Sequence, residues 1–142
     1  MRDYSNRNSV WLDTQFEYLT HLPCFWCNKL LTRGRSTVDH VIPSYLDSMV
    51  EENRVVCCKQ CNNERSKISS LASDLRKPNI IWGRGRITKW FAKRDEVRPL
   101  LHYYRQQIQL KLDVHMQMYC LNEINLILRL PKNYFSDKTS QK

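Results

Sequence analysis

The chain has 142 residues, with 23 Lys or Arg against 14 Asp or Glu, so its formal net charge is +9. This length suits one modest core, and the positive charge favours a polyanionic partner, nucleic acid first. No run approaches the roughly 18 apolar residues of a membrane span, and the N-terminal segment lacks the apolar region of a signal peptide. We therefore expect a cytoplasmic protein with no membrane partner.

A short helix is expected near the N-terminus. Ser9 is a candidate N-cap, and the helix should continue to about Leu19 before Pro23 stops it. The candidate buried positions on this helix are apolar or aromatic: Trp11, Phe16 and Leu19.

Two strands and a second helix are expected next, after a turn around Gly34. The β-branched run at 37–42 predicts a strand, which Pro43 should end because proline has no backbone donor. Residues 44–52 should form a loop, and the valines at 54–57 favour a second strand. From about 59 to 72 the composition is typical of a helix.

The remaining chain should be mainly helical. Pro78 should end the preceding helix, and residues 79–86 (NIIWGRGR) predict a loop or short strand. Thr88 is a candidate cap for a short helix, and Pro99 suits the start of a longer one. An apolar face is then expected before Pro131, with a break near its middle: Leu101, Tyr104, Ile108, Leu112, Leu121, Ile124, Ile127 and Leu128.

Charge divides the chain near residue 80. Residues 1–79 carry 11 basic and 9 acidic side chains, whereas residues 80–142 carry 12 basic and 5 acidic ones. We expect an α+β fold with a core and its N-terminal helix over 1–79. A basic loop and helical extension should follow over 80–131, and a disordered polar tail over 132–142.

Two cysteine pairs of equal spacing carry the clearest chemical signal. Cys24-x-x-Cys27 and Cys58-x-x-Cys61 are 30 residues apart, and such pairs are typical of a tetrahedral four-thiolate zinc site. A filled thiolate shell leaves no open position for catalysis, so we expect a structural Zn²⁺. Without a secretion signal, six cysteines indicate metal ligands in a reducing compartment rather than disulfides.

Other interpretations of the cysteines stay open. The four thiols can be ordinary buried residues, or one pair can be a redox motif. Cys57 can also pair with Cys61 across three residues. Cys58 is preferred because it keeps the x-x spacing and leaves Cys57 as a small apolar strand residue. Cys120 lies in a helical apolar pattern and is predicted to be a core thiol.

A set of polar residues accompanies the cysteine pairs. Asp39 and His40 lie in V-D-H-V-I-P, Asn53 lies in E-N-R-V-V, and Asn62 follows the last cysteine in C-K-Q-C-N-N-E-R-S-K. In these elements residues 24–67, under a third of the chain, resemble the HNH endonucleases with their ββα-metal core. Within that superfamily the motif spacing is similar to that of phage Holliday-junction resolvases.

The resemblance implies a role for each of these polar residues. His40 would be the general base that takes a proton from the attacking water. Asp39 and Asn62 would bind a catalytic Mg²⁺ or Mn²⁺, and Asn53 would order the loop between the strands without doing bond chemistry. The implied products are 5′-phosphate and 3′-hydroxyl ends of DNA.

Chemistry supports these residue types. A neutral imidazole can accept a proton at physiological pH, and a hard cation on one carboxylate and one amide oxygen keeps positions for water and phosphate. Adjacent residues on a regular strand point to opposite faces, however. Asp39 and His40 can therefore share a site only where the strand bends.

Basic residues beyond Asn62 are the candidate contacts to duplex or branched DNA. Arginines and lysines interleaved with aromatic residues suit backbone contact and base stacking, although a solvated basic face is an equal alternative. The candidates are Arg65, Lys67, Arg84, Arg86, Lys89, Lys93 and Arg94. The apolar stripe at 99–130 can be core, a homodimer surface or a docking helix for a larger complex.

These observations predict a metal-dependent HNH DNA endonuclease. Two rival functions stay open: a non-catalytic zinc-dependent nucleic-acid-binding or assembly module, and an RNA-directed nuclease.

Overall fold

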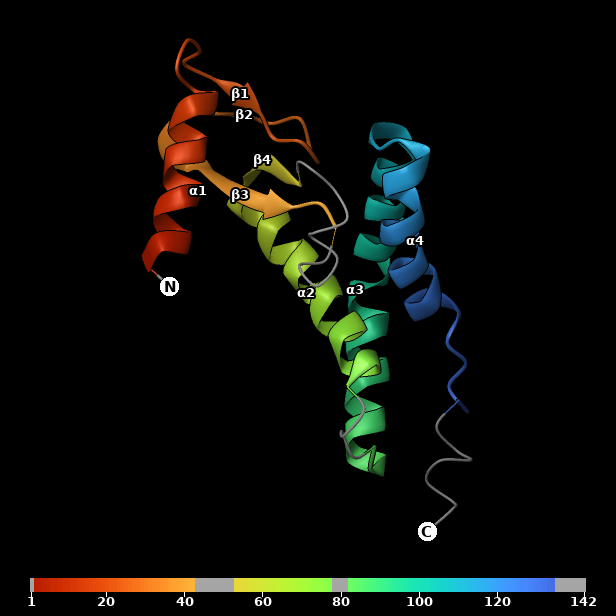
Figure 1. Cartoon of the computed structure of the whole chain (residues 1–142). Helices are drawn as coiled ribbons and strands as arrows, with labels where there is room; N and C mark the ends of the chain where they lie inside the picture. The colour runs from red at the N-terminus through yellow and green to blue at the C-terminus, as the bar shows by residue number, and fades with distance from the viewer. Residues whose placement is uncertain (1, 43–52, 78–81, 135–142) are drawn as a thin grey trace. The chain divides into compact units, whose positions relative to one another are not determined.

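The computed structural model describes residues 2–42, 53–77 and 82–134 (Figure 1). Over these residues the chain has four α-helices and two antiparallel two-stranded sheets, so the predicted α+β class is confirmed. The chain divides into two units, residues 1–65 and 66–142. The division falls inside α2 (Lys59–Arg76), earlier than the change in charge near residue 80. None of the helices in the described ranges is long and apolar enough to cross a membrane.

The N-terminal helix differs from the prediction. α1 spans Arg2–Gln15, so Ser9 lies inside it rather than capping it. Leu12 is the buried residue of this helix, whereas Leu19 lies beyond its end with 54% of its surface exposed. Trp11 and Phe16 are half-buried. The polar residues before Ser9 belong to the helix as well.

A small hairpin that the sequence did not predict surrounds the first cysteine pair. β1 (Leu22–Pro23) pairs with β2 (Leu30–Leu31), so Pro23 lies in a strand. The turn between them is closed by Asn28, whose φ of 67° is a left-handed conformation that asparagine tolerates. The 3-10 turn η1 (Arg33–Arg35) follows, which confirms the turn expected around Gly34.

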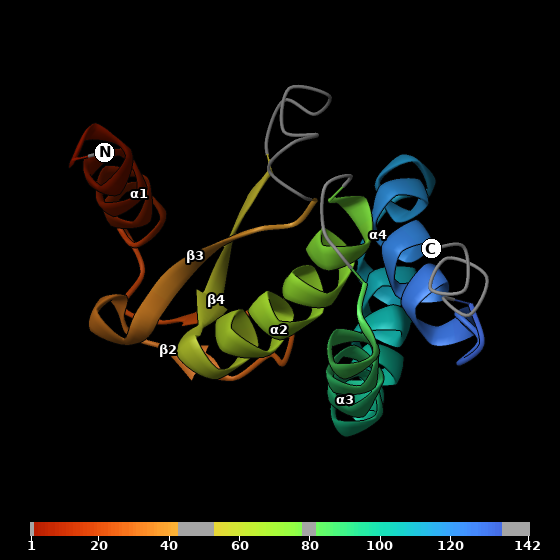
Figure 2. The same cartoon turned by 90° about the horizontal axis from the view of Figure 1, so that it is seen from below.

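The predicted hairpin is present with slightly different bounds. β3 (Ser36–His40) pairs with β4 (Arg54–Cys58) in a continuous antiparallel register from Ser36↔Cys58 to His40↔Arg54. In Figures 1 and 2, α1 and the first turns of α2 lie on opposite sides of this hairpin. Pro43 and the 44–52 loop lie outside the described residues.

The second unit consists of the later turns of α2 with α3 (Arg84–Lys111) and α4 (Val114–Arg129). α2 runs four residues further than predicted, to Arg76. The core of the second unit is formed by apolar side chains of these helices and of the residue that follows α4: Ile68, Leu71, Ala72, Trp90, Phe91, Val97, Leu101, Tyr104, Ile108, Cys120, Ile124, Ile127 and Leu130. Five of the eight residues of the predicted apolar face are buried (Leu101, Tyr104, Ile108, Ile124 and Ile127), whereas Leu112, Leu121 and Leu128 are half-buried. The predicted core role of Cys120 is confirmed.

Three predictions about α3 are wrong. Arg84 and Arg86 lie in its first turn rather than in a loop or strand, and Thr88 lies within the helix, donating to Arg84 O at 3.0 Å. Pro99 is inside the helix rather than at its start. An interior proline costs about 3 kcal/mol, and the buried side chains on both sides of Pro99 offset that loss.

The predicted break in the 99–130 segment is a tight turn at Leu112 and Asp113. Asp113 is the N-cap of α4, and its side chain accepts a hydrogen bond from Met116 N at 2.9 Å. Figure 1 shows α4 running back alongside α3. Exposed apolar residues remain on these helices, including Leu110, Val114 and Met118. A dimer or docking role for them stays a prediction. Of the predicted tail, residues 135–142 lie outside the described chain, as do residues 78–81.

Candidate metal centre and the adjoining hairpin site

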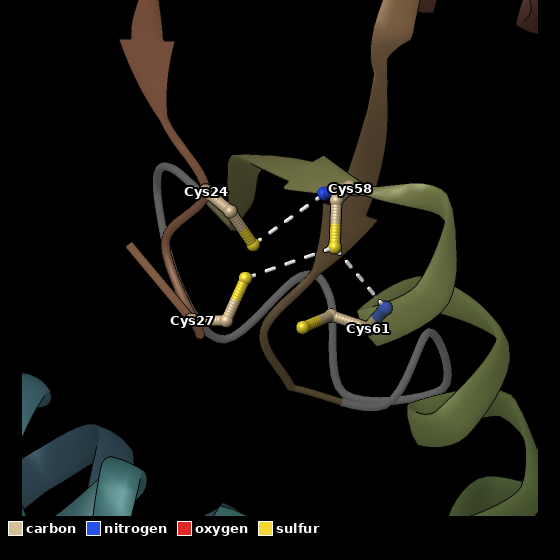
Figure 3. Close-up of side chains that lie close together, drawn as sticks. All are labelled: Cys24, Cys27, Cys58 and Cys61. Atoms are coloured by element: carbon tan, nitrogen blue, oxygen red, sulfur yellow. Dashed lines mark hydrogen bonds between the residues drawn. The ribbon is translucent and has the colours of Figure 1, made fainter. Parts of the chain in front are cut away.

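Four cysteines from two parts of the first unit converge on one point (Figure 3). Cys24 and Cys27 lie between β1 and β2, Cys58 ends β4, and Cys61 lies in the first turn of α2. Their sulfur atoms all lie within 4.8 Å of one another, and Cys27 is the most accessible of the four. This cluster can hold one metal ion.

The spacing of the sulfur atoms suits a tetrahedral ion. Four sulfurs at about 2.3 Å from a centre lie about 3.8 Å apart, and the Sγ atoms of Cys27 and Cys58 are 3.9 Å apart. That distance is far longer than the roughly 2.05 Å of a disulfide bond. All six cysteines of the chain are free.

Backbone amides point at two of the sulfurs. Cys58 N donates to Cys24 Sγ at 3.4 Å, and Cys61 N donates to Cys58 Sγ at 3.3 Å. Such donors stabilise negative charge on sulfur, which is the form that binds metal. The second of these contacts follows from the x-x spacing of Cys58 and Cys61, whereas the first joins residues 34 positions apart.

Cys57 lies beside the cluster but has a different character. A hydrogen bond from Cys57 lowers the pKa of Cys24 to about 3, helped by backbone amides and opposed by burial. The same hydrogen bond, with burial, raises the pKa of Cys57 above its usual range. Cys24 is thus the thiolate and Cys57 the neutral donor. Burial raises the pKa of Cys27, so a cation would be needed to ionise all four thiols together.

Asp39 lies on the face of the hairpin next to Trp26. The carboxylate is mostly buried, and its Oδ2 accepts a hydrogen bond of 2.8 Å from Trp26 Nε1 and a short one from Arg65 Nη1. None of the described residues donates to the other carboxylate oxygen, Oδ1. This carboxylate is therefore held in place by Trp26 and paired with the Arg65 guanidinium.

Arg65 is a structural clamp rather than an outward-reaching cation. Its Nη2 donates to Val41 O at 2.8 Å, its Nη1 also reaches His40 O at 3.2 Å, and its guanidinium lies 4.4 Å from the ring centroid of Trp26. Only 15% of the side chain is exposed. Its donors are therefore used inside the site in this structure, and the predicted contact of Arg65 with phosphates stays a prediction.

Asn62 reaches the same face of the hairpin as Asp39. Its Nδ2 donates to Thr37 Oγ1 at 3.1 Å and to Val38 O at 3.3 Å. Thr37 and Asp39 are two residues apart on a strand and so share a face. Since Nδ2 points at the strand, Asn62 Oδ1 is the atom left to act as an acceptor or ligand, and none of the described residues donates to it.

Asn53 fastens the two ends of the segment between the strands. Its side chain accepts from Ile42 N at 2.8 Å and donates to Ile42 O at 3.0 Å, and its carbonyl accepts from Val41 N at 2.9 Å. Asn53 is 5% exposed. A buried side chain that pins both polar groups of one residue fits the predicted role in ordering the loop.

His40 lies apart from these groups. The register is regular to the His40↔Arg54 pair, and directly opposed residues share a face. The Arg54 guanidinium lies 5.2 Å from the ring centroid of Trp11, on the α1 side. Strand alternation therefore directs His40 away from Asp39. Asp39 lies inside β3, which continues as a strand through His40, and the chain bends at the next two residues, Val41 and Ile42.

The basic candidates fall into two groups. Arg94 is 4% exposed and donates to Ile127 O at 3.5 Å and to Leu130 O at the end of α4. Arg94 therefore caps that helix from within the second unit, and its predicted role in nucleic-acid binding stays a prediction against which this burial counts. Exposed or half-buried positions on α2 and α3 hold the others: Lys67, Arg84, Arg86, Lys89 and Lys93.

Two site residues were missed from sequence. Trp26 is fully buried and orients Asp39, and Thr37 links Asn62 to the strand by donating to Cys57 O at 2.8 Å. The i, i+2 spacing of Thr37 and Asp39 is a signal that could have identified the threonine. Nothing in the spacing of Trp26 shows that its indole N–H faces a carboxylate.

No family model matches the chain, and searches of the curated proteins and of the solved structures also find no match. The HNH assignment therefore depends on the motif residues and their placement.

Proposed function

We propose that the chain is a metal-dependent HNH endonuclease that cuts DNA, with a structural zinc ion beside the active site. The observation that carries the proposal is the meeting of Asp39 and Asn62 on one face of the hairpin, next to the cysteine cluster. The hairpin supplies the carboxylate and the following helix supplies the amide. This arrangement agrees with the ββα-metal core that the motif resemblance implies.

Zinc is the proposed occupant of the cluster of Cys24, Cys27, Cys58 and Cys61. Four thiolates at tetrahedral spacing favour zinc among the available divalent ions. All four positions are filled by protein, so this ion would hold the first cysteine pair, the end of β4 and the start of α2 together and would take no part in catalysis.

Asp39 and Asn62 are the proposed ligands of a second, catalytic ion. Their Oδ1 atoms are hard oxygen donors, which suit Mg²⁺ or Mn²⁺. Such an ion would supply electrostatic stabilisation of charge that develops on phosphate oxygens. The chain's own contribution is orientation: Trp26 and Arg65 fix the Asp39 carboxylate, and Thr37 fixes the Asn62 amide.

His40 is the proposed general base. A neutral imidazole would take a proton from the attacking water, while the ordered end of β3 holds the backbone beneath it. Arg65 contributes to that order through His40 O and Val41 O. The water would attack phosphorus, and the 3′-oxygen would leave to give a 5′-phosphate and a 3′-hydroxyl.

A second candidate function is a non-catalytic zinc-dependent module that binds nucleic acid. Two observations favour it: the Arg65 guanidinium already neutralises Asp39, and the regular register directs His40 away from that carboxylate. In this case Asp39, Arg65 and Trp26 would be purely structural.

Nicking of supercoiled plasmid by the zinc-loaded protein with Mg²⁺ tests the proposal. His40→Ala and Asn62→Ala should each slow nicking by about 10²-fold or more, because each removes a group acting on the scissile phosphate. The exposed neighbour Asn63→Ala and the exposed His21→Ala are the matched controls and should nick at the parental rate. A ligase should seal the nicks if the ends are as proposed.

Two results would overturn this assignment. If His40→Ala and Asn62→Ala both nick at the parental rate, the proposed active site is wrong. DNA binding without nicking in any divalent ion would favour the non-catalytic module. Duplex DNA, branched DNA and RNA compared at one salt concentration decide the substrate, and faster cleavage of RNA would support the RNA-directed alternative.

A further inference from the structure

A hollow in the second unit lies between the later turns of α2 and the start of α3. Its volume is about 450 Å³, within the range of sites that hold one small ligand. The side chains that line it come from both helices: Leu71, Asp74, Gly85, Arg86, Lys89, Trp90 and Lys93.

Three of the lining residues form a cationic stripe along α3. Arg86, Lys89 and Lys93 recur at helical spacing, so they lie on one face of the helix. In the described part of the chain none of these three makes a salt bridge. Some other cations of the unit are paired with carboxylates, as in Arg76–Glu123 and Arg98–Asp95. The stripe therefore presents positive charge that none of the described residues neutralises by an ion pair.

The hollow has one acidic lining residue, and its charge is already shared. Asp74 Oδ1 lies 3.5 Å from Lys77 Nζ, and Lys77 is not part of the lining. The lining thus carries three positive charges against one partly neutralised negative charge. This balance selects an anionic ligand.

The floor of the hollow is apolar and rigid. Trp90 is 3% exposed and its Nε1 donates to Leu71 O at 3.1 Å, so the indole is fixed. Trp90 also contacts Phe91 edge to face at 4.9 Å between centroids. Gly85 leaves the rim open, because a Cβ at that position would meet nothing within 4 Å. A fixed apolar floor below free cations suits a ligand with both a flat apolar part and phosphate.

We propose that this hollow binds nucleotides of single-stranded nucleic acid. Arg86 and Lys93 are separated by about 10 Å along the helix axis, and Lys89 lies between them, so the three cations can follow the backbone of one strand. The three cations contact neighbouring phosphates, and one base enters the hollow, where it packs against the aliphatic stems of Arg86, Lys89 and Lys93 and the small exposed edge of Trp90. In a duplex the bases are stacked and paired, so only phosphates would be available and the floor would stay unused.

Fluorescence anisotropy of a labelled 12-residue oligothymidylate, without Mg²⁺, tests the proposal. The triple variant Arg86→Gln, Lys89→Gln and Lys93→Gln should weaken binding at least tenfold. It should also reduce the slope of log K against log salt by about 2, since about 0.7 is expected per single-strand phosphate. The control variant Arg98→Gln, Arg129→Gln and Lys132→Gln loses the same charge outside the hollow and should change affinity less than threefold. Circular dichroism of both variants should match the parent.

Further ligands separate the contributions. An oligomer of the same length with abasic sites keeps the phosphates and should bind about tenfold more weakly than oligothymidylate, as should a 12-base-pair duplex. Equal losses in the two triple variants would overturn the site. Abasic binding as tight as oligothymidylate binding would remove the base contact. Thymidine monophosphate binding as tightly as the 12-mer would assign the hollow to a free nucleotide instead.

This inference does not depend on the proposed nuclease activity. The assay contains no Mg²⁺ and measures no cleavage, and the variants leave the hairpin site intact. Failure of plasmid nicking would leave the binding result unaffected. Failure of the binding test would leave the proposed roles of His40, Asp39 and Asn62 unaffected, because the nicking assay tests those roles separately.

Discussion

Residues 1–65 and residues 66–142 bury different kinds of side chain. In the first unit the described hairpins are short, and cysteines supply much of the buried surface around Trp26. In the second unit, Leu101, Tyr104 and Ile127 belong to a continuous apolar core between helices. Small cores without many apolar residues usually need a metal or disulfides. We therefore expect the folding of the first unit to depend on its metal and the folding of the second unit to be independent of it.

Metal removal should give the largest difference between the units. The proposed zinc supplies on the order of 10 kcal/mol of folding free energy, by analogy with zinc-finger peptides. Chelation should therefore collapse the amide NMR signals of residues 22–61 while those of α3 and α4 persist. Cys58→Ala should have the same effect.

Cys57→Ala is the matched control for this experiment, because Cys57 is equally buried but is not a proposed ligand. It should keep one zinc per chain. The comparison fails if verified zinc loss leaves the 22–61 signals intact, or if Cys57→Ala releases zinc and Cys58→Ala does not.

Replacing the buried Arg94 should destabilise the second unit. Arg94→Leu should lower the free energy of unfolding by about 3 kcal/mol, because it leaves the carbonyls of Ile127 and Leu130 without their donor. Urea denaturation measures this loss. Arg98→Leu, one turn further along with a side chain 41% exposed, should change stability by less than about 1 kcal/mol. Similar losses in both variants would contradict the proposed role of Arg94.

The smallest expected effect is at the turn between α3 and α4. Asp113→Ala should destabilise the second unit by about 1 kcal/mol, since it removes the acceptor for Met116 N. Asp113→Asn keeps a capping oxygen and should be close to neutral. Thermal denaturation of the two variants compares them, and a larger loss for asparagine than for alanine would exclude side-chain capping.

The parts of the fold that sequence predicted are those set by short spacing. The x-x spacing of each cysteine pair brings its sulfurs together, and the β-branched residues near Val38 and Val55 favour strands that then pair. Helix limits near glycine and proline were not predictable in the same way. Around Gly83 and Pro99 the local signals for a loop and a helix start are overridden by packing of Trp90, Val97 and Leu101.

The roles of the two buried arginines depend on partners that are distant in sequence. Arg65 meets Val41 O across 24 residues, and Arg94 meets Ile127 O across 33. Net charge and aromatic neighbours in the sequence do not distinguish a buried cation from an exposed one. Composition therefore assigned both Arg65 and Arg94 to nucleic-acid binding. Arg86, Lys89 and Lys93 share that composition but lie at the surface, where the assignment is still open to test.

The proposed zinc is the feature on which the account of the first unit depends. X-ray absorption at the zinc edge, with metal analysis of protein purified without chelators, tests it most directly. We expect one zinc per chain, surrounded by four sulfurs at about 2.3 Å. A protein that carries no zinc, or a zinc shell that contains nitrogen or oxygen in place of any of the four sulfurs, would contradict it.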